Sequence, residues 1–195
     1  MKCETVYKVF SAIPELHTER LLLRKMAVGD CYDMYEYASS AAVTRYLTWS
    51  PHPDLDYTKE YLQYIGNHYK LGDFYDWAVI LKEENKMIGT CGFTRFHMHH
   101  NAAEIGYVIN PAYRGRGIAD EAVLAVMKFG FERLGLNRIE AKYIMGNEAS
   151  RRVMEKVGMT FEGVRRGEML IKGEYRDIGV CSILRSEARK KEIFE

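Results

Sequence analysis

The sequence predicts a single mixed α/β domain, built on a sheet with helices on its faces. The chain has 195 residues and is 47% hydrophobic, which suits one compact domain with a sizeable core and is short for two. Its apolar patterns run in the order strand, helices, a group of short strands, then strand, helix, strand, helix and a closing hairpin. No internal repeat, linker or low-complexity segment interrupts that order, so we expect residues 1–195 to form one domain.

The first predicted elements are a strand and two helices. Residues 20–24 are a short apolar run between arginines, typical of a strand, and Asp30 is placed to cap a helix that runs to about Ser39. The proline- and aromatic-rich residues 49–53 indicate a loop, and a second helix is expected over residues 58–70.

A group of strands follows. Residues 77–81 and 87–96 are apolar runs on either side of a polar turn at 83–86, which predicts a hairpin. A third strand is expected at 103–109, and Asn110-Pro111 ends it because the residue before a proline is restricted.

The last third of the chain alternates helices and strands. Apolar residues recur at spacings of three and four across residues 117–134, which predicts an amphipathic helix. Gly135 ends this helix, a strand is expected at 138–144, and a second helix at 148–157 is followed by Gly158. The runs 161–171 and 175–184 flank Lys172-Gly173-Glu174 and predict a closing hairpin.

Composition excludes several classes of protein. Twenty-eight Lys and Arg balance 27 Asp and Glu to a net charge of +1, which removes the electrostatic case for a large nucleic-acid or membrane footprint. No apolar run approaches the roughly 20 residues of a membrane span, and the charged start is unlike a secretion signal, so we expect a cytoplasmic protein.

No metal site is expected. Cys3, Cys31, Cys91 and Cys181 are scattered singly, without the C-x-x-C spacing of zinc or redox sites, and are expected to be reduced core residues. The histidines at 97, 99 and 100 have no carboxylate or cysteine at a spacing that completes a site, which favours a solvated loop.

The candidate binding motif is the glycine-rich turn at residues 113–119, Y-R-G-R-G-I-A. Two glycines let the backbone curl, and the curl turns successive N–H groups inward at a helix N-terminus, where they can hold a pyrophosphate. The motif is neither G-x-x-x-x-G-K-[ST] nor strict G-x-G-x-x-G; it fits R-x-x-G-x-A. The alternative is an ordinary tight turn with two solvated arginines.

This segment, N-P-A-Y-R-G-R-G-I-A, resembles the acetyl-CoA motif of the GNAT N-acetyltransferase superfamily. The strand at 103–109 resembles the one before that motif, and the segments at 147–150 and 155–159 resemble the motif after it. Residues 18–24, 46–49, 173–177 and 182–185 make the ribosomal-protein N-terminal (Rim-type) branch the most similar one.

The resemblance covers about residues 17–187 and implies a GNAT-like, mostly antiparallel twisted sheet with helices on both faces and splayed central strands. It leaves a charged tail at 187–195 and an N-terminal extension at 1–16, for which an edge strand and a partner-binding arm are the alternatives.

The resemblance also implies where acetyl-CoA binds. Val108 and Ile109 would offer unpaired backbone groups to the pantetheine arm, with an amide N–H left to polarise the thioester carbonyl. Asn147 would contact the ligand, although asparagine at a helix start is also an ordinary cap. The pyrophosphate would lie on the turn, whose six residues are Arg114, Gly115, Arg116, Gly117, Ile118 and Ala119.

Two residues are candidate catalysts. Glu104 would take the proton of the amine, directly or through water; its alternative is a structural or orienting carboxylate. Many relatives have a tyrosine where this chain has Met154, which leaves Ser150 as the donor to the leaving thiolate. The alternative for Ser150 is bonding within the first helical turn.

Other side chains have an ordinary structural interpretation beside a functional one. Tyr57, Tyr61 and Tyr64 have helical spacing and are expected to pack, or to wall an acceptor cleft together with Trp49 and Phe74. The pair at 151–152 would meet the 3′-phosphate of coenzyme A or form a solvated helix face.

The resulting hypothesis is an enzyme that transfers the acetyl group of acetyl-CoA to a primary amine, with the N-terminal α-amine of a (ribosomal) protein as the first choice. The alternatives are a small amine, such as a polyamine, an amino acid or an antibiotic, and a protein that senses acyl-CoA without turnover. Acetyl-CoA and the acceptor are the expected partners, without nucleic acid or membrane, and a homodimer is compatible with the sequence.

Overall fold

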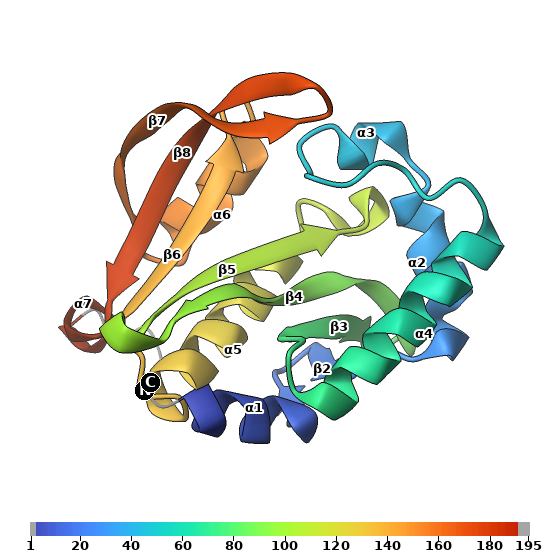
Figure 1. Cartoon of the computed structure of the whole chain (residues 1–195), viewed down its shortest axis with the longest axis horizontal. Helices are drawn as coiled ribbons and strands as arrows, with labels where there is room; N and C mark the ends of the chain where they lie inside the picture. Colours follow the sequence, from blue (N-terminus) through green and yellow to red (C-terminus); the bar gives the residue numbers. More distant parts are fainter. Residues whose placement is uncertain (1–2, 191–195) are drawn as a thin grey trace.

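A computed structural model describes residues 3–190 (Figure 1). Its eight strands form one sheet in the order β1-β2-β3-β4-β5-β6-β8-β7, and every neighbouring pair is antiparallel except β5 and β6. The mostly antiparallel mixed sheet is therefore confirmed. The strands are β1 (Leu16–His17), β2 (Leu21–Arg24), β3 (Asp76–Leu81), β4 (Lys86–His97), β5 (Ala102–Ile109), β6 (Arg138–Ile144), β7 (Thr160–Ile171) and β8 (Glu174–Leu184).

Helices cover both faces of the sheet, as expected. In Figure 1, α5 runs behind β4 and β5, whereas α2 and α4 lie together at the right-hand end. The α-helices are α1 (Cys3–Ser11), α2 (Cys31–Ala38), α3 (Ala41–Thr44), α4 (Leu55–Leu71), α5 (Ile118–Glu132), α6 (Glu148–Lys156) and α7 (Arg185–Lys190). Three single 3₁₀ turns, η1 (Val28–Asp30), η2 (Met98–His100) and η3 (Pro111–Tyr113), connect them.

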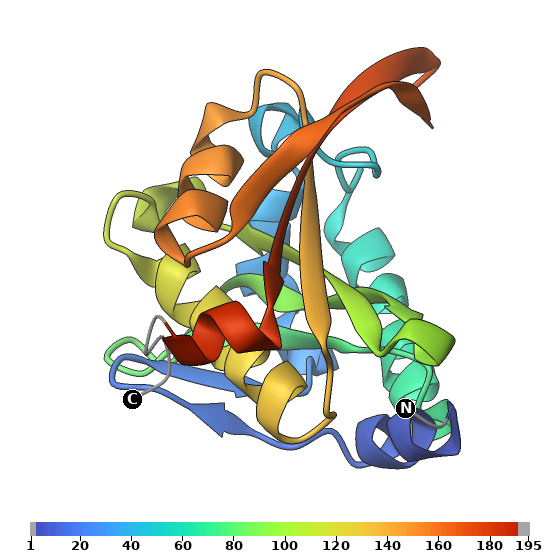
Figure 2. The same ribbon diagram turned by 90° about the vertical axis from the view of Figure 1, so that its left-hand side faces the viewer.

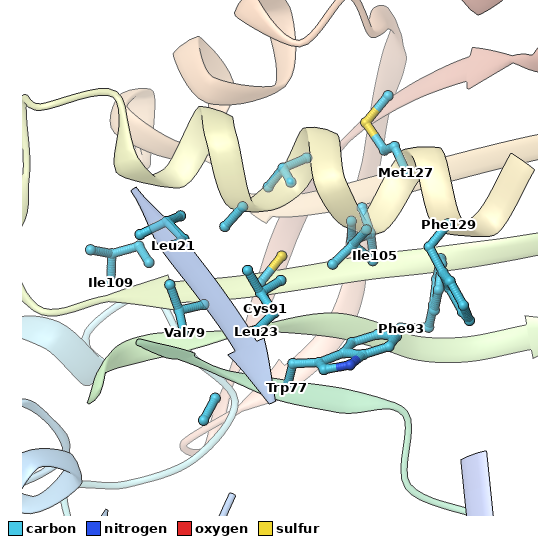
Figure 3. Packing of buried hydrophobic residues seen from close by; sticks show 14 of the residues in the cluster. Leu21, Leu23, Trp77, Val79, Cys91, Phe93, Ile105, Ile109, Met127 and Phe129 are labelled. Atoms are coloured by element: carbon cyan, nitrogen blue, oxygen red, sulfur yellow. The ribbon is translucent and has the colours of Figure 1, made fainter. Parts of the chain in front are cut away.

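The main core lies between the sheet and α5. Trp77 of β3 and Phe93 of β4 are buried against Phe129 of α5, as Figure 3 shows. Because side chains alternate along a strand, Asp76 points to the opposite face, where α2 and α4 pack. This alternation separates a wholly apolar layer from one that contains polar groups.

The N-terminal segment forms a helix that the sequence did not predict. In α1, Val6 and Phe10 are fully buried, and the Phe10 ring packs edge-on against Trp77 with centroids 5.5 Å apart. Leu16 then begins the two-residue edge strand β1. Residues 3–16 therefore belong to the domain, and they include a short edge strand.

Two helix starts differ from expectation. α4 begins at Leu55 because Asp54 caps it, accepting a hydrogen bond from the backbone N of Tyr57 at 2.7 Å. Asp30 precedes α2, but its carboxylate does not cap that helix: it accepts from the backbone N of Ala27 at 2.8 Å and pairs with Arg24. The capping role predicted for Asp30 was therefore wrong.

The C-terminal hairpin of β7 and β8 rises away from the body of the protein (Figure 2). After it, part of the expected charged tail forms α7, in which Ala188 is buried, and residues 191–195 lie outside the described range. Cys31, Cys91 and Cys181 are buried and free. Within residues 3–190, no helix is long and apolar enough to cross a membrane.

Candidate active site

The central strands β5 and β6 separate along their length. Their parallel pairing runs from Ala102 with Arg138 to Ile105 with Ala141, where the recorded register ends. Beyond that point β5 stays paired with β4, with Val108 opposite Thr90, while β6 stays paired with β8. The splay predicted for the central strands is thus present, and it opens beside Val108 and Ile109.

The glycine-rich turn lies at the wide end of this splay. Gly115 and Gly117 have φ values of 78° and 72°, a left-handed conformation that favours glycine. Gly117 is also the N-cap residue of α5, so the first backbone N–H groups of that helix face out of its end. The turn therefore has the backbone geometry of an anion-binding site.

A partly exposed ion pair between Arg20 and Glu121 holds the back of the turn. Arg20 donates to the backbone O of Arg116 at 2.8 Å and to a carboxylate oxygen of Glu121 at 2.7 Å. Glu121 also accepts from the Thr18 hydroxyl. Burial on its own raises the pKa of Glu121, but the hydrogen bonds from Thr18 and Arg20 outweigh it and lower that pKa. Because Arg20 binds the Arg116 carbonyl on one side of the turn, the backbone N–H groups of the turn are free to face the opposite side.

A cavity of about 630 Å³ opens in front of the turn. Its wall combines the turn, the splayed end of β5, the first turns of α6, and α3 with the residues after it. Of the predicted cofactor residues, all but Arg116 line this cavity; they are Val108, Ile109, Arg114, Gly115, Gly117, Ile118, Ala119 and Asn147. The Arg116 guanidinium lies instead over the Tyr113 ring, 5.3 Å from its centroid.

Ser150 lies in the same cavity and is joined to a tyrosine that the sequence analysis missed. Its Oγ is 3.0 Å from the hydroxyl of Tyr107, which lines the cavity from β5. Asn147 caps α6, accepting from the backbone N of Ser150 at 3.3 Å. Strand alternation could have found Tyr107, because it shares a face with Ile105 and Ile109. Met154 is buried and takes no part in the cavity wall.

Glu104 lines neither this cavity nor the second one described below. Its carboxylate is 3.0 Å from the Nζ of Lys142 and accepts from the Thr94 hydroxyl at 3.1 Å. Both members of the ion pair are largely buried. Glu104 is therefore a charge-compensated carboxylate on the splayed strand, and its catalytic role stays a prediction.

A second, smaller cavity of about 170 Å³ lies on the α2 and α4 side of the sheet. Val108 belongs to the walls of both cavities, and it lies three residues beyond Ile105, the last residue of β5 that pairs with β6. The wall of the second cavity is mostly aromatic with a few polar groups; it consists of Met34, Tyr37, Ala38, Trp49, Ser50, His52, Tyr57, Tyr61, Asp76, Thr90 and Val108.

The polar groups of the second cavity have unusual surroundings. Asp76 accepts from the backbone N of Trp77 at 3.0 Å and from the Thr90 hydroxyl, yet burial raises the pKa of its carboxyl to about 7. His52 is bonded to Thr58, with its Nδ1 2.9 Å from Oγ1, and burial lowers the pKa of its imidazole. Sequence reasoning missed Asp76 and His52.

The predicted aromatic wall is present only in part. Trp49, Tyr57 and Tyr61 line the second cavity around His52. Tyr64 lies over His68 instead, and Phe74 packs on Tyr69. Tyr64 and Phe74 are therefore packing residues outside the wall of this cavity.

Of the arginine pair in α6, one member lies at a cavity and the other does not, and two of the candidate histidines lie in an exposed turn. Arg152 lines the larger cavity, whereas Arg151 pairs with Glu155 at 2.9 Å along α6. His99 and His100 lie in the exposed turn η2. Within the described residues, no three His, Cys, Asp or Glu side chains are grouped in a way that could hold a metal ion.

Comparisons with known proteins agree with this geometry. The family model described as "Acetyltransferase (GNAT) domain" matches residues 20–160. An uncharacterized N-acetyltransferase, p20, of Bacillus licheniformis is 36% identical over 88% of this chain and 97% of its own length. The solved structure of a GNAT-family acetyltransferase from Bacillus anthracis is 33% identical, covers 89% of this chain and 100% of its own, and superposes with a TM-score of 0.79.

Two more distant relatives from Escherichia coli have named acceptors, and the acceptors differ. One is the [Ribosomal protein uS5]-alanine N-acetyltransferase, 26% identical over 83% of this chain and 86% of its own length. The other is the spermidine N(1)-acetyltransferase, 26% identical over 87% of this chain and 88% of its own length. Sequence similarity alone therefore does not select the acceptor.

Proposed function

Because the chain belongs to the GNAT acetyltransferase family and is an acetyl-CoA-dependent N-acetyltransferase, we propose that it acetylates the α-amine at the N-terminus of a protein. Acetyl-CoA occupies the larger cavity, with its pyrophosphate on the turn at residues 114–119 and its pantetheine arm along Val108 and Ile109. The acceptor amine reaches the thioester from the second cavity.

The observation that supports this acceptor is the composition of the second cavity. Among its described wall residues, Asp76 is the sole carboxylate, and the others are aromatic, aliphatic or uncharged polar residues together with His52. A polyamine has several ammonium groups and is best held by several carboxylates, whereas the N-terminus of a protein brings a single one. A volume of about 170 Å³ suits one amine with a small side chain.

The chemistry favours the same acceptor. An α-amine has a reference pKa of about 8 and a lysine side chain one of about 10.4, so more of the α-amine is neutral at pH 7. A ribosomal protein is our first choice of substrate because one relative is named for such a protein. The Tyr107 and Ser150 hydroxyls lie where a leaving thiolate can receive a proton, which argues against a non-catalytic sensor.

Thiol release from acetyl-CoA, measured across a panel of acceptors, tests the proposal. The panel contains ribosomal-protein N-terminal peptides, the same peptides with a blocked α-amine but a free lysine, spermidine, and single amino acids. We expect the free N-terminal peptides to give the highest kcat/KM, by about tenfold or more, because only they combine an α-amine of low pKa with an extended chain. Faster turnover of spermidine, or of the blocked peptides, would overturn the proposed acceptor.

A further inference from the structure

We propose that Asp76 is the amine-binding group of this enzyme: its carboxylate binds the ammonium group of the acceptor inside the second cavity and takes the first proton from it. The inference rests on the proposed function, because it assigns a place and a protonation step to the same acceptor. It gives the catalytic base a position on β3 that no motif in the sequence marks.

The position of Asp76 follows from strand pairing. Asp76 lies opposite Gly92 on β4, and two residues earlier on β4 Thr90 lies opposite Val108. Thr90 therefore lies between the two sites: its hydroxyl donates to the Asp76 carboxylate, and its backbone is paired with β5, the strand along which the thioester is expected. Asp76 and Val108 also share the wall of one cavity. An amine bound by Asp76 lies on the acceptor side of the splay.

The Asp76 carboxylate has capacity for a further donor. An ionised carboxylate offers about four acceptor positions, and the recorded donors to Asp76 are the backbone N of Trp77 and the Thr90 hydroxyl. No lysine or arginine is among the described residues of the cavity wall, so no cation of the protein occupies the remaining positions. An incoming ammonium group supplies both the donors and the charge that are missing.

Tyr37 provides a second, independent observation. Its side chain is 2% exposed and lines the same cavity, yet its hydroxyl has no hydrogen-bond partner in the described structure. A buried hydroxyl without a partner costs about 1–3 kcal/mol, so in native proteins a water molecule or a ligand usually completes it. Burial raises the pKa of the Tyr37 phenol, so it stays neutral and can accept a second N–H of the amine.

The rest of the wall suits a single cation. The rings of Trp49, Tyr57 and Tyr61 surround His52, with centroid separations of 4.9 to 5.5 Å. Aromatic faces attract an ammonium group through their quadrupoles. Because burial lowers the pKa of His52, its ring is neutral at neutral pH and does not repel the ligand.

The protonation of Asp76 suits a base that works near neutral pH. Burial raises its pKa to about 7, and the hydrogen bonds from Thr90 and Trp77 prevent a larger rise. A base is most effective when its pKa lies near the working pH. The ionisable groups on its side of the sheet come from α2, the loop before α4 and α4 itself; they are Tyr37, His52, Tyr57, Tyr61 and Tyr69, and Cys91 lies nearby on the opposite face of β4. Apart from His52, all of these are neutral in their protonated form.

The ammonium group gives one proton to the Asp76 carboxylate, and the freed lone pair forms the C–N bond to the thioester carbon. The C–S bond then breaks and its electron pair leaves with sulfur. The thiolate takes the second proton lost by nitrogen, through the Ser150 hydroxyl. The products are the acetylated amine, coenzyme A as a thiol, and one proton that Asp76 releases to solvent.

Glu104 is the rival base. It is already paired with Lys142 at 3.0 Å and lines neither cavity, whereas Asp76 has no cationic partner in the described wall and lies in the second cavity. These surroundings assign the first proton to Asp76.

The pH dependence of kcat/KM in an Asp76→Asn variant tests the assignment. Asparagine still accepts from the backbone N of Trp77, so the fold is retained. Asp73→Asn is the matched control, since Asp73 contacts His68 outside both cavities. We expect Asp76→Asn to lower kcat/KM for the acceptor at pH 7.5 by about 30-fold, with an unchanged KM for acetyl-CoA. In the wild type we expect kcat/KM to rise with pH around pH 7 as Asp76 loses its proton, and we call this rise the acidic limb. The acceptor amine titrates identically in all variants, so the loss of the acidic limb in Asp76→Asn is due to Asp76 itself.

Two outcomes would overturn the assignment: Asp76→Asn with the wild-type pH profile, or an equal loss of activity in Asp73→Asn. Thr90→Val provides a second arm, because it keeps the carboxylate and removes the hydroxyl that lowers its pKa. Because the pKa of Asp76 rises when this hydroxyl is removed, we expect the acidic limb of the kcat/KM profile to move to higher pH in Thr90→Val. A limb that does not move in Thr90→Val also contradicts the assignment.

A binding measurement separates this inference from the identity of the acceptor. The carboxyl carbon of Asp76 is followed by NMR during a pH titration, and Asp76→Asn identifies its resonance. We expect propylamine to lower the apparent pKa of Asp76, while propanol at the same concentration leaves it unchanged. If propylamine has no effect, the amine site fails even where the peptide panel succeeds. If the panel selects spermidine, the proposed acceptor fails while the Asp76 site stands.

Discussion

The two cavities that share Val108 as a wall residue differ in what the rest of their walls is made of. In the larger cavity, the groups available to bind a ligand include backbone N–H groups, which lie at a turn with two left-handed glycines and at the starts of α5 and α6. The smaller one uses side chains from α2, α4, the loop before α4, and β3 to β5. Where backbone groups bind the ligand, substitutions that shorten a side chain have little effect on binding, whereas substitutions that add a side chain to a glycine block it. A site made of side chains is damaged by losing them.

The largest effect is expected at the backbone-built site. Gly117→Glu puts a side chain at φ 72° and a negative charge at the turn that we propose binds the pyrophosphate. We expect acetyl-CoA binding, measured by calorimetry, to weaken by at least about 100-fold. Gly173→Glu is the control, since Gly173 also has a positive φ, 83°, but lies in the hairpin turn between β7 and β8. Tight binding by Gly117→Glu would place the phosphates elsewhere.

A smaller effect is expected where the two cavities cooperate in the reaction. Ser150→Ala and Tyr107→Phe each remove one hydroxyl of the pair that lies 3.0 Å apart in the larger cavity. We expect kcat to fall by about 10- to 100-fold in each, with little change in the affinity for acetyl-CoA, because in our proposal the hydroxyls protonate the leaving thiolate. An unchanged kcat in Ser150→Ala reduces Ser150 to a structural residue of α6.

The support behind the turn is expected to matter less than the turn itself. Arg20→Met removes the donor to the Arg116 carbonyl and the partner of Glu121. We expect the KM for acetyl-CoA to rise about fivefold to tenfold, since one charge-assisted hydrogen bond contributes on the order of 1–2 kcal/mol. The KM for the acceptor is the internal control. An equal rise in both constants means that Arg20 supports the whole fold rather than the turn.

The smallest expected effect concerns stability against pH. Asp76 has a folded pKa of about 7, above its ordinary 3.8, so it lowers the free energy of unfolding as pH rises from about 4 to about 7. Glu162, bonded to Arg138, has a pKa of about 2, so its contribution is present above about pH 4.5 and is lost as pH falls towards 2. In thermal unfolding from pH 2 to 8, Asp76→Asn should gain stability above pH 7 and Glu162→Gln should lose it above pH 4.5. The opposite signs would contradict both assignments.

The same difference between the two regions explains what could be predicted from the sequence. The turn at residues 114–119 follows from consecutive residues, because glycine freedom and a helix start are local properties. The splay of β5 and β6 was predicted by family resemblance and is confirmed by the pairing that ends at Ile105. Asn147 and Ser150 could be placed in the cavity for the same reason, since they begin a predictable helix.

The acceptor side has no local signal. Asp76 begins an ordinary apolar strand, and only the pairing of β3 with β4 brings it to Thr90. Tyr37 and His52 reach the cavity through the packing of α2 and α4, which depends on the whole fold. Glu104 was a reasonable candidate because it lies on the strand of the site, but its pairing with Lys142 depends on the neighbouring strand. The residues that line the acceptor side therefore depend on long-range packing, which local sequence patterns do not reveal.

The most direct test of the account is a crystal structure with a bisubstrate ligand, in which coenzyme A is joined through an acetyl linker to the α-amine of an N-terminal peptide. The account predicts the pyrophosphate on residues 114–119, the linker beside Val108, and the first peptide residue in the cavity formed by Tyr37, Trp49 and Asp76. A peptide that leaves along the opposite face of the sheet, with that cavity empty, would contradict it.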